Sequence, residues 1–288
     1  MTDILPPLVD AGWLKAHLGD GDLVVLDASW YMPAQNRDPE AEYAAGHIPG
    51  ARRFDFDGKV KDHASTLPHM LPAEPEFQAA ARALGISATS RIVCYDGAGI
   101  FAAPRAWWMF RAMGHANVAV LNGGMPAWKA AAGAVEAGPE KSVAAGDFTA
   151  RLQSGLISDA SGLKSAIDAG GVQVIDARSA GRFTGVEPEP RAGLRSGHMP
   201  GARNLPFDRL LQDGAYRDAS VLADLFRQAG LTGEKPVIAS CGSGVTASVL
   251  ALGAEAAGLA PFAVYDGSWS EWGQDSRPDL PVVTGEAG

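Results

Sequence analysis

The stretch Ala45-Gly-His-Ile-Pro-Gly-Ala-Arg52 decides the organisation of this chain, because it returns 151 positions later as Ser196-Gly-His-Met-Pro-Gly-Ala-Arg203. Three further segments have a counterpart in the second half, in the same order: 23–28 with 172–177, 96–102 with 241–247, and 120–124 with 264–268. Repetition in a fixed order indicates a supersecondary unit used twice. The sequence therefore predicts a tandem duplication.

Each half contains short apolar runs rich in Val and Ile, which are typical of buried strands. These runs are 23–26, 91–95, 118–121, 172–175, 236–239 and 262–265. Alanine-rich stretches at helical spacing lie between them: 76–84, 103–113, 220–229 and 245–257. The alternation predicts an α/β fold in which each half is a parallel sheet flanked by helices. We expect domains over 1–135 and 156–288, joined by a linker at 136–155 that lacks apolar periodicity.

Composition narrows the class of protein. The 288 residues carry a formal net charge of −9, which argues against binding to a nucleic-acid backbone. Two cysteines are too few for a secreted disulfide framework and favour a reducing, cytoplasmic compartment. The N-terminal residues lack the basic and apolar regions of a signal peptide, and no apolar run approaches the about 18–20 residues of a membrane span. We expect a cytoplasmic protein that binds neither nucleic acid nor membrane.

The chemistry is predicted to lie in the loop Cys241-Gly-Ser-Gly-Val-Thr-Ala247, which follows an apolar run and precedes a helical pattern. Its glycines let several backbone N–H groups converge on one atom, and the N-terminus of the helix adds a positive field. Both effects favour the thiolate, the nucleophilic form of cysteine. The same cradle would hold a persulfide anion without a metal or an organic cofactor. The alternative, a small buried hydrophobe, is the usual fate of a free cysteine but does not explain the flanking glycines.

With these features the chain resembles the rhodanese superfamily in its tandem-domain form, over nearly its whole length. The loop 241–247 is similar to the active loop of 3-mercaptopyruvate sulfurtransferases, and the repeated Gly-His-X-Pro-Gly-Ala is a general rhodanese feature. The resemblance implies two rhodanese-like domains. It also implies transfer of sulfur from 3-mercaptopyruvate to a Cys241 persulfide, release of pyruvate, and passage of the sulfur to cyanide, thioredoxin or a small thiol.

The two halves are expected to differ in activity. The first half carries Asp96 where the second carries Cys241, and an aspartate cannot hold a sulfane sulfur. The first domain is therefore expected to be non-catalytic and to pack against the active one, helping to close its site. Cys94 lies inside an apolar run and aligns with Ala239, so we expect it to be an inert core residue.

The resemblance also assigns the donor-binding residues. Arg182 and Arg191 match two family arginines that grip the carboxylate and keto groups of the donor, a task that suits the planar guanidinium. The remaining donor-binding residues are implied to be those of the active loop: Gly242, Gly244, Val245 and Thr246. The alternative is that both arginines are solvated loop residues. Arg195 is a nearby competitor outside the matched stretch.

A Ser-His-Asp arrangement has been proposed for the family, and the resemblance carries it onto Ser243, His69 and Asp57. The spacing from aspartate to histidine is about one residue longer than in relatives, so Asp55 or Asp62 can take the place of Asp57. His69 has the alternative role of binding a loop backbone.

Other polar and aromatic residues are interpreted as structural. His47 and His198 belong to the turn that both halves keep, including the half without a cysteine loop. Asp27 and Asp176 are expected to anchor loops at the ends of strands. The aromatic cluster 107–110 is expected in a core or a domain interface.

The sequence bears on three rival functions. Thiosulfate sulfurtransferase is the alternative within the family, but Gly242 and Ser243 offer no charge for a dianion such as thiosulfate. A cysteine phosphatase needs an arginine at the position that Ala247 takes. A rhodanese-fold module used only for binding would have lost Cys241.

Overall fold

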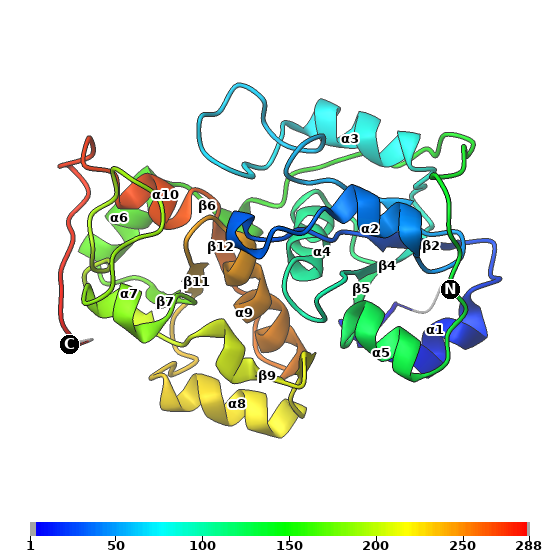
Figure 1. Cartoon of the computed structure of the whole chain (residues 1–288). Helices are drawn as coiled ribbons and strands as arrows, with labels where there is room; N and C mark the ends of the chain where they lie inside the picture. The colour runs from blue at the N-terminus through cyan, green and yellow to red at the C-terminus, as the bar shows by residue number, and fades with distance from the viewer. Residues whose placement is uncertain (1–3, 287–288) are drawn as a thin grey trace. The chain divides into compact units, whose positions relative to one another are not determined.

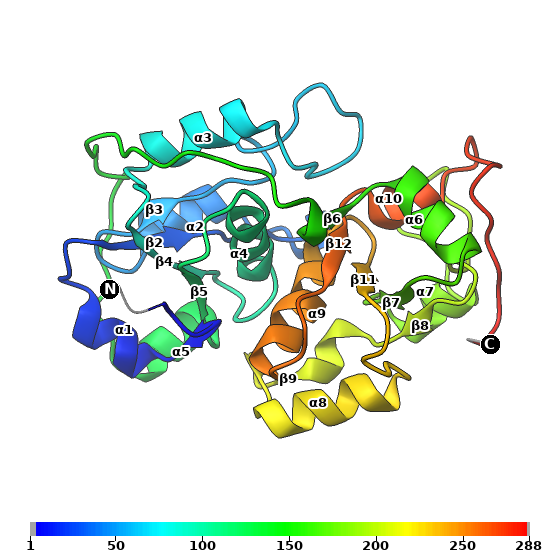
Figure 2. The same cartoon turned by 180° about the vertical axis from the view of Figure 1, so that it is seen from behind.

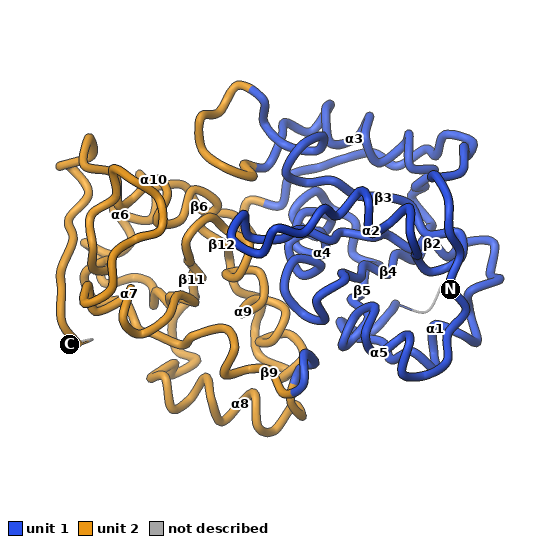
Figure 3. Tube along the Cα trace, in the orientation of Figure 1, with its two compact units in different colours: residues 1–63, 71–153, 213–216 blue, residues 64–70, 154–212, 217–288 orange. Residues whose placement is uncertain are grey.

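The computed structural model describes residues 4–286 (Figures 1 and 2). The chain divides into two compact units, shown in Figure 3. Unit 1 holds the described part of Met1–His63 together with Leu71–Gln153 and Asp213–Tyr216. Unit 2 holds Ala64–Met70, Ser154–Gln212 and the described part of Arg217–Gly288. The domain boundaries expected at 135 and 156 stay a prediction.

Each unit is built on a five-stranded parallel sheet with the same strand order. In unit 1 the order is β1-β5-β4-β2-β3, and in unit 2 it is β6-β12-β11-β7-β8. The strands of unit 1 are β1 Leu8–Val9, β2 Leu23–Asp27, β3 Arg52–Arg53, β4 Arg91–Tyr95 and β5 Val118–Leu121. Those of unit 2 are β6 Ile157–Ser158, β7 Gln173–Asp176, β8 Arg203–Asn204, β11 Val237–Ser240 and β12 Ala263–Tyr265. A separate two-stranded ribbon pairs β9 Leu211–Gln212 with β10 Ala215–Tyr216.

Helices connect the strands, as parallel pairing requires. Those of unit 1 are α1 Ala11–His17, the 3₁₀ turn η1 Pro33–Gln35, α2 Pro39–Ala45, α3 Glu74–Ala83, α4 Ala103–Ala112 and α5 Gly124–Ala130. Those of unit 2 are η2 Ser154–Leu156, α6 Ala160–Asp168, α7 Ala180–Thr184, η3 Phe207–Leu210, α8 Ala219–Gln228, α9 Val245–Ala256 and α10 Ser268–Trp272. The predicted α/β fold is confirmed, with each expected apolar run forming a strand.

The sheet of unit 1 is covered on both faces because its strands are apolar on both. Val93 and Tyr95 of β4 pack in one core with α1 and α5. Cys94 lies between them and is fully buried, so its side chain points to the opposite face. On β4 and β5 that other layer includes α4, whose aromatic cluster 107–110 is buried throughout. Burial of this kind supplies most of the favourable free energy of folding.

In unit 2 the central strand β11 leads into α9, which packs against both β11 and β12. Most of the side chains of α9 are buried, whichever way they point. A helix that is apolar all round belongs in the interior. The end of β11 is therefore held between neighbouring strands and a buried helix.

The repeated turn has the same structure in both units, as expected for a structural feature. His47 Nδ1 lies 2.8 Å from the carbonyl oxygen of Tyr43, and the two rings stack at 4.0 Å. His198 Nδ1 lies 2.8 Å from the carbonyl oxygen of Phe183, with the rings stacked at 3.8 Å. Each histidine thus ties its turn to the preceding helix. Among residues 4–286, no helix is long and apolar enough to cross a membrane.

Candidate active site

Cys241 is the first residue after β11, and α9 begins four residues later at Val245. Its thiol is buried, and the backbone N–H of Gly244 donates to its sulfur at an N···Sγ distance of 3.1 Å. Gly244 caps α9 with φ +82°, a left-handed conformation that a side chain would strain. The glycine therefore aims an N–H group and the start of a helix at the sulfur.

Helix α10 holds the cysteine loop through hydrogen bonds to its backbone. The N–H groups of Trp269 and Ser270 donate to the carbonyl oxygens of Cys241 and Gly242, at 3.0 and 2.9 Å. Ser270 Oγ also donates to the Gly242 oxygen at 2.7 Å. Ser268 Oγ accepts the N–H of Cys241 at 3.2 Å. These contacts satisfy two carbonyl groups and one N–H group of the loop and so fix its backbone.

Both predicted donor-binding arginines lie beside this loop in unit 2. A Cβ atom placed on Gly242 would come within 3.1 Å of Arg182 Nη2 and 3.9 Å of Arg191 Nη1. Arg191 Nη1 also lies 3.4 Å from Ser270 Oγ, the hydroxyl that holds the loop. The structure thus brings Cys241, Arg182 and Arg191 together, and glycine at 242 leaves room for the guanidinium groups.

The competitor Arg195 has a different role. Its guanidinium donates to the carbonyl oxygens of Trp272, at 2.7 Å, and of Gly273 and Arg277, at 3.3 and 3.1 Å. Its own carbonyl oxygen accepts the indole N–H of Trp269 at 2.9 Å. Arg195 therefore fastens α10 and the segment after it.

Glu189 is a site residue that the sequence reasoning missed. Its carboxylate accepts from Arg182, with Nη2–Oε2 at 2.6 Å, and from Arg178, with Nη1–Oε1 at 2.7 Å. Only 1% of its side chain is exposed. Arg178 also donates to both carboxylate oxygens of Asp176 and lies over the ring of Trp269 at 4.1 Å. Local sequence gives one weak signal, namely that Glu189 lies inside the matched segment between the two arginines.

The charges of this cluster nearly cancel. Asp176 and Glu189 offset Arg178 and Arg182 in direct contacts of 2.6–2.7 Å. Arg191 makes no ion pair among those described, so it leaves one positive charge next to Gly242. A site with this balance suits a ligand that carries a single negative charge.

The three residues of the expected Ser-His-Asp arrangement lie in two units. Ser243 is buried in the cysteine loop, and His69 is buried in the segment Ala64–Met70, which also belongs to unit 2. His69 has φ +60°, an uncommon conformation for a residue other than glycine and one that often marks a functional position. Asp57 belongs to unit 1 and accepts the indole N–H of Trp30 at 3.0 Å. Asp55 caps its own turn by accepting two backbone N–H groups.

In unit 1 the side chain of Asp96 fills the loop that corresponds to the cysteine loop. Its Oδ2 accepts the N–H groups of Phe101, Ala102 and Ala103 at 2.8–3.1 Å, and its Oδ1 accepts that of Ala98 at 3.0 Å. Burial raises the pKa of Asp96 to about 6, against the opposing effect of these N–H donors. The loop of unit 1 therefore has N–H groups that bind an anion, and the Asp96 carboxylate occupies them.

The second thiol is placed as expected for a core residue. Cys94 is fully buried in β4, and burial raises the pKa of its thiol well above the usual range. A protonated thiol without access to solvent is a poor nucleophile. Among the described residues, no group of three or more His, Cys, Asp or Glu side chains is arranged to hold a metal ion.

A family model described as "Rhodanese-like domain" matches the chain twice, over residues 10–131 and 159–275. The thiosulfate/3-mercaptopyruvate sulfurtransferase 1 of Arabidopsis thaliana, named as mitochondrial, is 42% identical over 98% of this chain and 79% of its own length. The 3-mercaptopyruvate sulfurtransferase of Rattus norvegicus is 41% identical over 96% of this chain and 95% of its own. The crystal structure of SseA from Escherichia coli, a 3-mercaptopyruvate sulfotransferase, aligns with a TM-score of 0.83 at 37% identity, covering 93% of this chain and all of that one.

The buried carboxyl of Asp96 predicts a pH effect on stability. Its pKa of about 6 in the folded chain lies above the ordinary value of 3.8 for an aspartate, so folding favours the protonated form. The stability that the protonated carboxyl contributes is complete below the pKa of the unfolded chain and is lost as the pH rises through the pKa of the folded chain. Asp96→Asn lacks this titration. From about pH 4 to about pH 8 the variant should therefore gain on the order of 1–3 kcal/mol of unfolding free energy relative to the wild type.

Urea unfolding of both proteins at the two pH values measures the change. Each curve is followed by circular dichroism and tested for a single transition, because a chain with two units need not unfold in one step. A difference between the two proteins that stays constant with pH would contradict the raised pKa.

Proposed function

Because this chain belongs to the rhodanese-like family, we propose that it moves sulfur from 3-mercaptopyruvate through a persulfide on Cys241. The observation that carries the proposal is the convergence of three groups on one loop. The Gly244 N–H donates to the Cys241 sulfur, and two guanidinium groups lie beside Gly242. One arrangement therefore serves both a sulfur nucleophile and the carboxylate of its donor.

In the first half-reaction the carboxylate and keto groups of the donor bind at Arg182 and Arg191. The Cys241 thiolate attacks the sulfur of the donor, so that an S–S bond forms and the C–S bond breaks. The electron pair of the broken bond goes to carbon, giving the enolate of pyruvate. The proton of the donor thiol ends on that carbon, which yields pyruvate and a Cys241 persulfide anion. The N–H of Gly244 stabilises the negative charge on the Cys241 sulfur when this sulfur attacks and when it is released.

In the second half-reaction an acceptor attacks the outer sulfur of the persulfide. With cyanide the products are thiocyanate and the free Cys241 thiolate; with a thiol the outer sulfur leaves as a new persulfide. Thioredoxin or a small thiol is the acceptor we propose for the cell. The presence of only two cysteines supports a reducing compartment such as the cytoplasm.

The proton movements are assigned to Ser243, His69 and Asp57. The Ser243 hydroxyl belongs to the cysteine loop, and it would hydrogen-bond the keto oxygen or pass a proton to the leaving carbon. His69 would orient that hydroxyl, and Asp57 would support the histidine. The left-handed backbone of His69 supports a functional reason for its position.

Thiosulfate is the alternative donor, and the charges at the site favour 3-mercaptopyruvate over it. Thiosulfate is a dianion, whereas 3-mercaptopyruvate carries one carboxylate. The cluster of Arg178, Arg182, Asp176 and Glu189 is nearly neutral, and Arg191 adds a single positive charge. Steady-state rates with each donor should give a higher kcat/KM for 3-mercaptopyruvate; a higher value for thiosulfate would reverse the assignment.

Two cysteine variants test the nucleophile. Cys241→Ser should retain less than about 0.1% of the wild-type turnover, because a serine hydroxyl cannot accept the sulfane sulfur. Cys94→Ala should retain at least about half and lose about 1–2 kcal/mol of stability, since it only shortens a buried side chain. Pyruvate release is the readout. Loss of turnover in the Cys94 variant alone would exchange the roles of the two thiols.

A variant of Glu189 tests the charge argument. Glu189→Gln keeps one acceptor oxygen for Arg182 but removes a negative charge, which raises the net charge of the cluster by one. The kcat/KM for thiosulfate should rise about three- to tenfold relative to that for 3-mercaptopyruvate. Glu187→Gln is the matched control, because Glu187 is exposed and bonds Ser179 instead. An unchanged ratio in Glu189→Gln would show that this charge does not set the donor preference.

A variant of His69 tests the proton path. Asparagine tolerates a left-handed backbone better than most residues, so His69→Asn should fold. If His69 handles a proton, kcat should fall about 100-fold with a smaller change in KM. Alkylation of Cys241 should proceed at the wild-type rate, because the cysteine loop is intact. A full kcat would remove His69, and with it Asp57, from the mechanism.

A further inference from the structure

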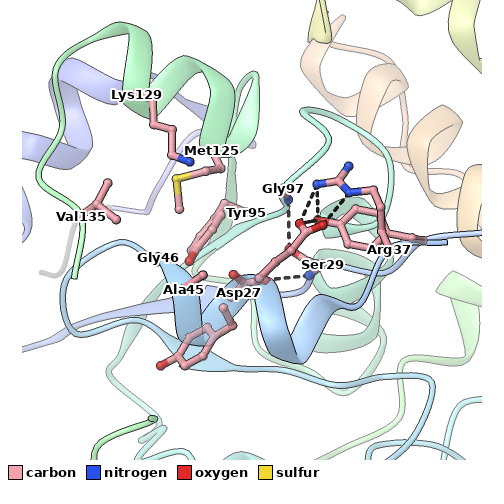
Figure 4. Close-up of a pocket in the computed structure, with 13 residues that line it drawn as sticks. Asp27, Ser29, Arg37, Ala45, Gly46, Tyr95, Gly97, Met125, Lys129 and Val135 are labelled. Atoms are coloured by element: carbon pink, nitrogen blue, oxygen red, sulfur yellow. Dashed lines mark hydrogen bonds and ion pairs between the residues drawn. The ribbon is translucent and has the colours of Figure 1, made fainter. Parts of the chain in front are cut away.

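Unit 1 contains a pocket of about 310 Å³ that the proposed reaction does not use. It lies where β2 and β4 end, and the helices α2 and α5 supply other parts of its wall (Figure 4). The carboxyl ends of parallel strands are the usual place for ligands in α/β sheets. Its lining includes Asp27, Ser29, Met125 and Lys129.

The corresponding place in unit 2 is filled by side chains. Arg178 follows the end of β7, and its guanidinium grips the Asp176 carboxylate with Nε at 3.0–3.1 Å and Nη2 at 2.6 Å. The guanidinium also lies over the ring of Trp269, at 4.1 Å. None of the Arg178 side chain is exposed. Unit 2 thus shows a guanidinium group bound over the strand-end aspartate.

Unit 1 keeps the aspartate and replaces the two large side chains. Asp27 ends β2 as Asp176 ends β7, and each accepts a backbone N–H from two residues later at 2.9 Å. That later residue is Ser29 instead of arginine, and Met125 stands in the repeat where unit 2 has tryptophan. The smaller Ser29 and Met125 leave the pocket open, and Asp27 lines it. Tyr95 stands where unit 2 has Ser240, and its hydroxyl group donates a hydrogen bond to the Asp27 carboxylate in the pocket wall.

The nearest guanidinium to Asp27 does not fill this space. Arg53 Nη1 lies 3.9 Å from Asp27 Oδ1, beyond hydrogen-bond distance. Its closest hydrogen bonds go to backbone carbonyl oxygens, that of Asp27 at 2.9 Å and that of Ser29 at 2.7 Å. In unit 2 the side chain of Asn204 donates to the two corresponding carbonyl groups. Arg53 therefore makes the same backbone contacts as Asn204 and does not take the place of Arg178 over the aspartate.

The other charges of the lining are of two kinds. Arg37 and Glu42 bind each other in a two-point contact, with Nε–Oε1 at 2.7 Å and Nη2–Oε2 at 2.6 Å. Lys129 comes from α5 and makes no hydrogen bond or ion pair among those described for this part of the chain. Figure 4 shows Lys129 and Asp27 on separate elements around the pocket. A ligand would thus meet a carboxylate at one end and an ammonium group at the other.

We propose that this pocket binds a free amino acid with a cationic side chain. The side-chain guanidinium or ammonium group lies over Asp27, as Arg178 lies over Asp176 in unit 2. The α-carboxylate of the ligand faces Lys129. A volume of about 310 Å³ accommodates a molecule of this size. An arginine residue within a peptide lacks the free carboxylate that Lys129 requires, so the ligand is the free amino acid.

Isothermal titration calorimetry of the full chain with L-arginine tests the proposal. Saturable binding of one L-arginine per chain is expected, with a Kd between about 10 μM and about 1 mM. Lys129→Met should weaken binding by about fivefold or more, because it removes the partner of the carboxylate. Lys164→Met, on an exposed face of α6, is the matched control and should bind as the wild type does.

Ser29→Arg supplies the second test, because it installs in unit 1 the residue that fills the place in unit 2. Its guanidinium should occupy the pocket over Asp27 and abolish L-arginine binding, with folding checked by circular dichroism. Agmatine has the guanidinium but no carboxylate and should bind about fivefold more weakly than L-arginine, or worse. Absence of L-arginine binding to the wild type, equal binding by agmatine, or wild-type binding by both Lys129→Met and a folded Ser29→Arg would each overturn the proposal.

Discussion

The hydrogen bond from the Gly244 N–H to the Cys241 sulfur is the contact on which the proposed chemistry depends. It exists because β11 ends at Ser240 and α9 begins at Val245, which leaves a short turn that Gly244 completes in a left-handed conformation. The sheet fixes one end of the turn, and a buried helix fixes the other. From behind, α10 binds two carbonyl groups of the loop. The sulfur therefore meets a positive field that is built into the fold and needs no further group to create it.

The buried charges beside this loop are paired through Glu189. Buried ions are costly unless they are paired and hydrogen-bonded, and Glu189 satisfies this condition for two arginines at once. Its contact holds Arg182 in the place where a donor would meet it. The same pairing limits the free positive charge beside Gly242 to that of Arg191. In the proposed reaction, one carboxylate therefore decides both the position of an arginine and the kind of anion that the site prefers.

The two units show how one loop gives two outcomes. In unit 2 the N–H of Gly244 donates to a thiol sulfur, whereas in unit 1 four N–H groups bind the Asp96 carboxylate. The pocket beside Asp27 follows the same logic, because a residue that fills unit 2 is replaced by Ser29 in unit 1. In unit 1 the Asp96 carboxylate thus occupies the loop that corresponds to the cysteine loop, and the pocket beside Asp27 is open.

Much of this was visible in the sequence because it depends on local patterns. Apolar runs located the strands, the glycines around Cys241 identified the loop, and the run around Cys94 indicated a core thiol. The contacts of Glu189 and Ser268 could not be predicted from the sequence, because they join side chains to distant groups and no local spacing encodes them. The same holds for the membership of Ala64–Met70 in unit 2, since long-range packing decides it. The roles of His69 and Asp57 stay predictions.

The most direct measurement is the intact mass of the chain after incubation with 3-mercaptopyruvate in the absence of an acceptor, followed by peptide mapping without reducing agent. The account predicts an increase of about 32 Da, one sulfur atom, on the peptide that contains Cys241, and its loss when cyanide is added. An unchanged mass, or the added sulfur on the Cys94 peptide, would contradict it.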